Sequence, residues 1–238
     1  MALIALEELG IAEQEVAVTL THSMLDGGHL GLAFHTEEGP RVLHLAWHKD
    51  IRLDCFGTDP WLASKLAVPN AAGMQIVAIL RMTADQKPPI QYGINLLAAK
   101  GSFSLLGGYE APEGSDGLTC ATFVTEHLAG AGIRLVDEDT WPETEANKEW
   151  GKTVCQILKH TGADESHVAT VRANTQGLRL RPFEVAGVST LESTKWPVKH
   201  PEAQPLAVGA EEALNTGYPR APERSEDTAT DPTASPAS

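Results

Sequence analysis

Cys120 is the residue of this chain whose setting most favours covalent chemistry. Turn-forming residues at 114–117 precede it, and apolar residues follow it with helical spacing, at Phe123, Val124, Leu128 and Ala131. We therefore expect Cys120 in the first turn of a helix that ends near Gly130. The free N–H groups and positive dipole at a helix start favour a thiolate, which predicts a lowered thiol pKa and a reactive nucleophile. The alternative is that Cys120 is a small buried hydrophobic residue.

Two histidines on a predicted β-hairpin could supply the base that such a thiol needs. His29 begins the alternating run 29–35, and His44 lies in the alternating run 41–48, with a turn at 36–40 between them. Side chains alternate between the faces of a strand, so the large apolar residues of both runs share one face and the histidines share the other. Whichever register pairs the strands, His29 and His44 lie within roughly 5–8 Å of each other. Gly31 is expected to leave open space beside them.

Such a pair could do the proton transfers of nucleophilic catalysis. One histidine would accept the thiol proton, and the other would orient it, as the third member of a catalytic triad does. The alternative is that both are polar residues on the solvent side of a half-exposed sheet.

The elements that position these residues follow from hydrophobic periodicity. The pattern predicts a strand over residues 15–20 and a fully buried strand over 75–82. It predicts helices over 90–99 and 144–160, and it fits a late strand or a loop over 177–185. Residues 50–75 are rich in turn formers and predict no single structure. Early strands and later helices favour an α+β fold with an antiparallel sheet packed on helices. We expect one domain over residues 1–200 and a disordered tail, rich in proline and acidic residues, over 201–238.

Composition narrows the function classes. A net charge of −14 over 238 residues argues against binding to nucleic acid or to anionic membranes. No apolar run is long enough to cross a membrane, and the first residues do not resemble a signal peptide. Three cysteines are too few for a disulfide framework, which favours the reducing cytoplasm. We expect no metal and no other cofactor.

The order of these motifs resembles a known family. His29-Leu30-Gly31-Leu32, Val42-Leu43-His44-Leu45 and Cys120-Ala121-Thr122-Phe123-Val124 are similar to the three motifs of the circularly permuted papain-like cysteine hydrolases of the NlpC-type superfamily. That group includes the YiiX-like and lecithin:retinol acyltransferase-like branches. The resemblance covers roughly residues 20–135, and the segment Pro89-Ile90-Gln91-Tyr92 resembles the YiiX-like spacing ahead of the cysteine.

The resemblance implies a permuted papain-like fold and a Cys–His–His mechanism. Cys120 would attack a carbonyl, His29 would act as the base and His44 would orient it. The backbone N–H of Cys120 would help to stabilise the oxyanion. We expect Gly31, Tyr92 and Thr119 to contact the substrate, a protein or peptide cleaved at an amide, peptide or isopeptide bond.

Other interpretations stay open at this point. The chain could be an acyltransferase or thioesterase acting on a lipid or acyl substrate, or a non-catalytic binding module of papain-like fold. Cys55 and Cys155 are weaker nucleophile candidates, and an unpermuted arrangement would pair Cys120 with His160 or His167. A zinc site could be built from His29, His35, His44 and His48, although no HExxH motif or paired-cysteine spacing supports it.

Overall fold

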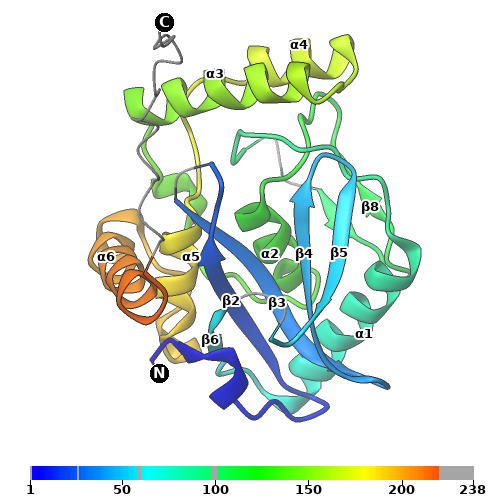
Figure 1. Cartoon of the computed structure of the whole chain (residues 1–238), viewed down its shortest axis with the longest axis vertical. Coiled ribbons are helices and arrows are strands. Elements are labelled where there is room, and N and C mark those ends of the chain that lie inside the picture. Colours follow the sequence, from blue (N-terminus) through cyan, green and yellow to red (C-terminus); the bar gives the residue numbers. More distant parts are fainter. Residues whose placement is uncertain (1, 26, 58–59, 98–100, 220–238) are drawn as a thin grey trace, which may run out of the picture.

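The structure is a computed structural model, and it describes residues 2–25, 27–57, 60–97 and 101–219. Its centre is a six-stranded antiparallel sheet with the strand order β1-β6-β2-β3-β4-β5 (Figure 1). In that order the strands are Ile4–Ala5, Leu62–Lys65, Val16–His22, Gly28–Thr36, Gly39–Trp47 and Asp50–Cys55. A two-stranded ribbon joins β7 (Ser102–Phe103) to β8 (Tyr109–Glu110).

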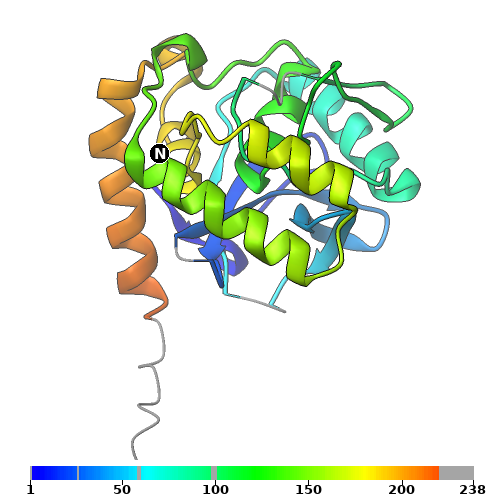
Figure 2. The same cartoon turned by 90° about the horizontal axis from the view of Figure 1, so that it is seen from above.

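Six α-helices in the described residues surround the sheet. They are α1 (Asn70–Gln86), α2 (Cys120–Ala129), α3 (Glu145–His160), α4 (Glu165–Ala173), α5 (Pro182–Ser189) and α6 (His200–Gly217), with 3-10 turns at Leu6–Glu8, Glu138–Thr140 and Ser193–Lys195. Helix α2 packs on β3 and β4, and α5 packs on β2, β3 and β6 with α6 outside it. Helices α3 and α4 pack on each other across one end of the molecule (Figures 1 and 2). No helix in the described ranges is both long and apolar enough to span a membrane.

The hairpin prediction is confirmed, and so is the mixed α+β class with an antiparallel sheet. The apolar residues of the alternating runs are fully buried in the main core beneath α1, α2 and α5, namely Leu30, Leu32, Phe34, Leu43 and Leu45. The other face carries a smaller apolar cluster that includes Ala33, Val42 and Trp61 and is covered by the N-terminal segment. Both faces of this hairpin are therefore buried, rather than one.

Three element predictions inside the domain are wrong in whole or in part. Residues 182–185, expected in a late strand or loop, form the start of α5. Residues 75–82 belong to α1, and Ile76, Val77 and Leu80 lie on the helical face that packs into the main core. A short apolar run of this kind fits a buried strand as well as a buried helix face, which explains the error. Residues 90–97 are not helical. Their backbone is held instead by long-range bonds, such as the donation of the Gly93 N–H to the carbonyl of Leu118. The last residues of that prediction, 98–100, lie outside the described residues.

The expected disordered tail also begins too early. Residues 200–217 form α6, which packs on α5 and contacts β2, and its residues Ala203, Ala207, Ala210 and Leu214 are buried. Small residues at this spacing let two helices approach closely, a signal that the proline- and acid-rich composition of the segment obscured. The remainder of the expected tail, 220–238, lies outside the described residues.

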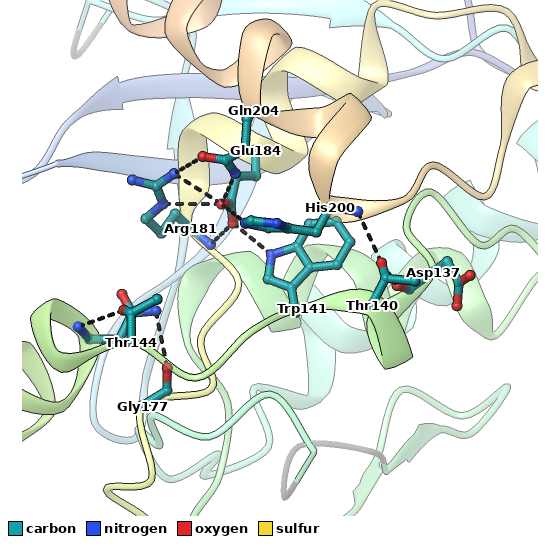
Figure 3. Close-up of polar contacts among 10 residues, drawn as sticks. Asp137, Thr140, Trp141, Thr144, Gly177, Arg181, Glu184, His200 and Gln204 are labelled. Atoms are coloured by element: carbon teal, nitrogen blue, oxygen red, sulfur yellow. Dashed lines mark hydrogen bonds and ion pairs between the residues drawn. The ribbon is translucent and has the colours of Figure 1, made fainter.

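A buried carboxylate ties the last two helices to the loop before α3. Glu184, in the first turn of α5, is 2% exposed and accepts hydrogen bonds from Trp141 Nε1 (2.9 Å), the Arg181 backbone N–H (2.7 Å) and side-chain Nε (3.1 Å), and Gln204 Nε2 (2.8 Å) (Figure 3). Several donors are needed because a buried charge is costly unless it is paired and hydrogen-bonded. The same bonds fix the start of α5, which follows directly on residues of the cavity described below.

This network predicts a large stability loss on truncation. Glu184→Ala should lower the free energy of unfolding by about 2–4 kcal/mol, because the buried Trp141 and the half-buried Arg181 and Gln204 lose their acceptor. Urea denaturation measures the change, and Glu192→Ala, an exposed acid, is the matched control. Equal losses in the two variants would show that the network contributes nothing beyond surface charge.

A buried histidine on α2 predicts acid sensitivity. His127 is fully buried, its Nδ1–H donates to the Phe123 carbonyl, and its ring stacks on Phe103 with centroids 3.6 Å apart. Burial lowers the pKa of His127 to about 3. Because this folded-state pKa is below the unfolded value of about 6.5, protonation favours unfolding. The stabilisation is complete above that unfolded value and is lost as the pH falls towards 3.

The measurement is the pH dependence of urea unfolding between pH 7 and 4. His127→Phe should flatten it by about 1.4 kcal/mol per pH unit over the lower part of that range, since one proton fewer is bound on unfolding. An unchanged slope in the variant would mean that His127 is not buried as a neutral imidazole.

Candidate active site

The site lies where β3 and β4 separate. Their pairing runs from Thr36–Gly39 to Leu32–Leu43. Beyond that point each strand stays paired on its other side only, β3 with β2 as far as Gly28 and β4 with β5 as far as Trp47. The two histidines occupy this part of the strands, so they meet through their side chains rather than across a backbone ladder.

A continuous chain of hydrogen bonds joins these histidines to a carboxylate. His29 Nε2 lies 2.7 Å from His44 Nδ1, and His44 Nε2 lies 2.8 Å from an oxygen of Asp54 on β5. The two imidazole rings meet edge to face, with centroids 4.9 Å apart. Trp61 packs on both, at 5.9 Å from His29 and 5.5 Å from His44. The predicted His29–His44 pairing is therefore present, with a third member that sequence patterns did not reveal.

The carboxylate sets the tautomer of both rings. An ionised Asp54 can only accept, so His44 Nε2 carries the proton and His44 Nδ1 offers a lone pair. That lone pair can only accept, so His29 Nε2 carries a proton in turn. The remaining nitrogen, His29 Nδ1, is then an unprotonated base. This is the protonation pattern that a general base next to a thiol requires.

Cys120 is the first residue of α2, as predicted. Thr119 is the N-cap, and its side chain and that of Thr122 form a reciprocal capping box. The thiol is nearly buried, at 5% exposed. The backbone N–H of Leu30 acts on the sulfur as a donor, and it belongs to the peptide group that joins His29 to Leu30. The sulfur therefore lies beside the backbone of the proposed base.

The predicted lowering of the thiol pKa is wrong for the resting site. Burial raises the pKa of Cys120, and it outweighs the N–H of Leu30, the charge of Arg179 and the backbone N–H groups of Ala121 and Cys120, which all act in the opposite direction. Desolvation disfavours a charged thiolate more than the helix start favours it. Burial, with smaller contributions from the charges of His44 and Arg52, also lowers the pKa of His29 to about 3. The resting pair is consequently a neutral thiol and a neutral imidazole.

Both groups line one cavity of about 550 Å³. The histidines belong to the face of the sheet that carries Trp61, whereas Cys120 belongs to the main core on the other face. The separation of β3 from β4 brings these two faces to a common wall. Among the described residues, no hydrogen bond links the thiol to His29 in this resting state; hydrogen bonds of this kind often tighten only when substrate binds.

The predicted substrate residues have different outcomes. Tyr92 and Thr119 line the cavity, whereas Gly31 does not. A Cβ at Gly31 would lie 2.6 Å from a methyl group of Val42 and 3.0 Å from the hydroxyl of Thr19, so this glycine permits close strand packing. The expected open space beside the histidines is therefore wrong at Gly31.

Two histidines that had other expected roles position Tyr92 instead. The Tyr92 N–H donates to His48 Nδ1 at 3.3 Å, and His167 Nε2 donates to the Tyr92 carbonyl at 3.1 Å. Their rings lie 4.6 Å apart. His48 is thereby engaged away from the His29–His44 pair, and His167 away from Cys120.

The remaining alternatives receive no support from the geometry. Cys55 is exposed at the end of β5, and Cys155 is buried in α3. His35 binds the carbonyl of Thr36 at the far end of β3, and His160 lies at the end of α3. In the part of the chain that the structure describes, no group of three or more histidine, cysteine or acidic side chains is arranged to hold a metal ion.

Sequence patterns missed three residues of the site, namely Asp54, Trp61 and Arg179. Asp54 and Trp61 fall in the segment 50–75, where turn formers obscured β5. Pairing 50–55 with β4 as a further hairpin strand would have placed Asp54 beside His44. Arg179 comes from a loop before α5, and its place on the cavity wall depends on tertiary packing that no local pattern encodes.

Comparison with known proteins leaves the family open. No protein-family model matches this chain, and neither the curated proteins nor the solved structures contain a significant match.

Proposed function

We propose that this protein is a thiol hydrolase of permuted papain-like fold that cleaves an amide, peptide or isopeptide bond, acting in the cytoplasm on a protein or peptide. One observation carries the proposal: a cysteine at a helix start shares a cavity with a His29–His44–Asp54 hydrogen-bond chain that leaves His29 Nδ1 as an available base. A structural cysteine requires none of these polar partners.

The chemistry divides into two acyl transfers. His29 Nδ1 takes the thiol proton while sulfur attacks the substrate carbonyl, so an S–C bond forms and the carbonyl electrons move to oxygen. The backbone N–H of Cys120 helps to stabilise that oxyanion. Collapse expels the amine, which receives the proton from His29 and leaves a thioester. His29 then removes a proton from water, and the attack of water releases the acid and the free thiol.

His44 and Asp54 act as positioning residues in this scheme. When His29 becomes an imidazolium, its Nε2–H remains bonded to His44, which in turn donates to Asp54. The carboxylate thus stabilises positive charge two rings away without taking the proton. If the acceptor is an alcohol or amine rather than water, the same steps give acyl transfer.

The buried thiol favours a second candidate. Because burial raises the pKa of Cys120 and no described bond joins it to His29, a non-catalytic papain-like binding module is the alternative function. It predicts that Cys120 never forms an acyl-enzyme.

An acyl-enzyme experiment separates the two. With 4-nitrophenyl acetate, the wild-type protein should release a burst of nitrophenolate of one equivalent and carry an acetyl group on Cys120 by peptide mass spectrometry. His29→Ala should slow the burst by roughly 100-fold or more, because the base is lost. Cys55→Ser is the matched control and should leave the burst intact. An unchanged burst in Cys120→Ser would contradict the hydrolase proposal.

The tautomer argument makes its own prediction for Asp54. In Asp54→Asn the amide can donate to His44 Nε2, so the proton of His44 moves to its Nδ1. His44 Nδ1 then donates to His29 Nε2, and the proton of His29 moves to its Nδ1. His29 Nδ1 is then protonated and cannot act as the base. Acylation should fall by about 100-fold or more with little change in thermal stability. Asp85→Asn, at an exposed acid of α1 away from the cavity lining, is the control. Equal rates in the two variants would contradict the proposed role of Asp54.

A further inference from the structure

The cavity wall carries positive charge in a strongly acidic protein. Two arginines, Arg52 and Arg179, line the cavity, and no aspartate or glutamate does so among its described lining residues. The whole chain has a net charge of −14. Within the described ranges, the acidic side chains therefore lie outside the lining of this cavity.

Arg179 is held rigidly at this wall. Its neighbours anchor it on both sides: the Leu178 carbonyl accepts from Leu96 N–H, Leu180 is 1% exposed, and Arg181 is bound to Glu184. The guanidinium carbon lies 3.4 Å from the ring centroid of Trp150, a close cation–π stack. Stacking covers the face of the guanidinium but leaves the N–H groups at its edge available.

These N–H groups have no acceptor in the described structure. Among the described residues Arg179 makes no hydrogen bond and no ion pair, although a guanidinium offers five donors. The carboxylate whose charge acts on it is that of Glu184, and the oxygens of Glu184 are already occupied by Trp141, Arg181 and Gln204. Burial lowers the pKa of Arg179 to about 10, so it remains charged at neutral pH.

Two tryptophans of the same wall also have N–H donors without an acceptor in the described part of the chain. Trp61 and Trp150 each bury an indole N–H that has no acceptor among the described residues. Buried donors are rarely left unpaired in folded proteins. These two indole nitrogens are inaccessible, so the donor that the wall offers to a ligand with oxygen acceptors is the guanidinium of Arg179.

We propose that Arg179 is a specificity-determining residue that binds an anionic group, a carboxylate or a phosphate, of the substrate next to Cys120. The proposal rests on the proposed function for its chemistry, since the bound anion would hold the scissile carbonyl near the thiol. Arg179, Cys120 and Tyr92 line the same cavity, and the charge of Arg179 acts on the other two side chains, so the anion subsite shares the cavity of the reacting sulfur. The substrate class is therefore an acyl donor with a negative charge close to the bond that is cleaved.

Binding to an inert protein tests this without any turnover. In the full chain carrying Cys120→Ala, calorimetry would compare N-acetyl-leucine with N-acetyl-leucinamide, which share a shape and differ in charge. The acid should bind more tightly, and adding Arg179→Gln should weaken the acid roughly 10- to 100-fold while leaving the amide unchanged. Arg179→Lys should retain part of the preference, and Arg172→Gln, at an exposed arginine of α4, should retain all of it.

Inorganic phosphate in the same titration identifies the anion. Tighter binding of phosphate than of the acid, lost in Arg179→Gln, supports a phosphate-bearing substrate, and the reverse order supports a carboxylate. Equal binding of acid and amide, no measurable binding of either anion, or a preference that survives Arg179→Gln overturns the proposal. Thermal unfolding checks that each variant is folded. The binding experiment uses Cys120→Ala and therefore does not depend on acylation of Cys120. A negative acyl-enzyme experiment leaves the binding result valid, and a negative binding experiment leaves the hydrolase proposal intact.

Discussion

The bond between Asp54 and His44 determines which protons the site can move. A carboxylate accepts and does not donate, so this one contact fixes the tautomer of His44 and, through it, that of His29. The rest of the arrangement depends on the outcome. Had His29 carried its proton on Nδ1, it would have no unprotonated nitrogen free of His44, and the shared cavity would offer the thiol of Cys120 no base.

Burial gives this site its second constraint. The cavity disfavours charge on both the thiol and the imidazole, so the resting state is neutral and a thiolate–imidazolium pair forms only when something offsets the loss of water. Backbone N–H groups at Leu30, Cys120 and Ala121 and the charge of Arg179 act in that direction. An anionic substrate would neutralise Arg179 but would also exclude the remaining water, which strengthens every fixed dipole at the sulfur.

The predictable part of this molecule is the part encoded by local periodicity. Strict alternation placed His29 and His44 on one face of a hairpin, and helical spacing placed Cys120 at a helix start. The errors arise where two structures share a pattern. The run at Ile76–Leu80 fits a buried strand and one face of a helix equally well, and the spaced alanines of α6 were obscured by the acidic and proline-rich residues between them. The raised pKa of Cys120 and the place of Arg179 depend on what packs around them, and that information is not local in the chain.

The β3–β4 ladder determines where this chain can tolerate insertions. The hairpin turn at 37–38 lies at the end of the strands opposite the histidines, and the paired positions from Thr36–Gly39 to Leu32–Leu43 lie between them. Because this ladder fixes the register, residues inserted at the turn would lengthen a surface loop without shifting His29 relative to His44. A single residue inserted between Leu43 and His44 would instead turn the imidazole to the opposite face of the sheet. Length variation is therefore compatible with the site at one end of the hairpin and incompatible with it at the other.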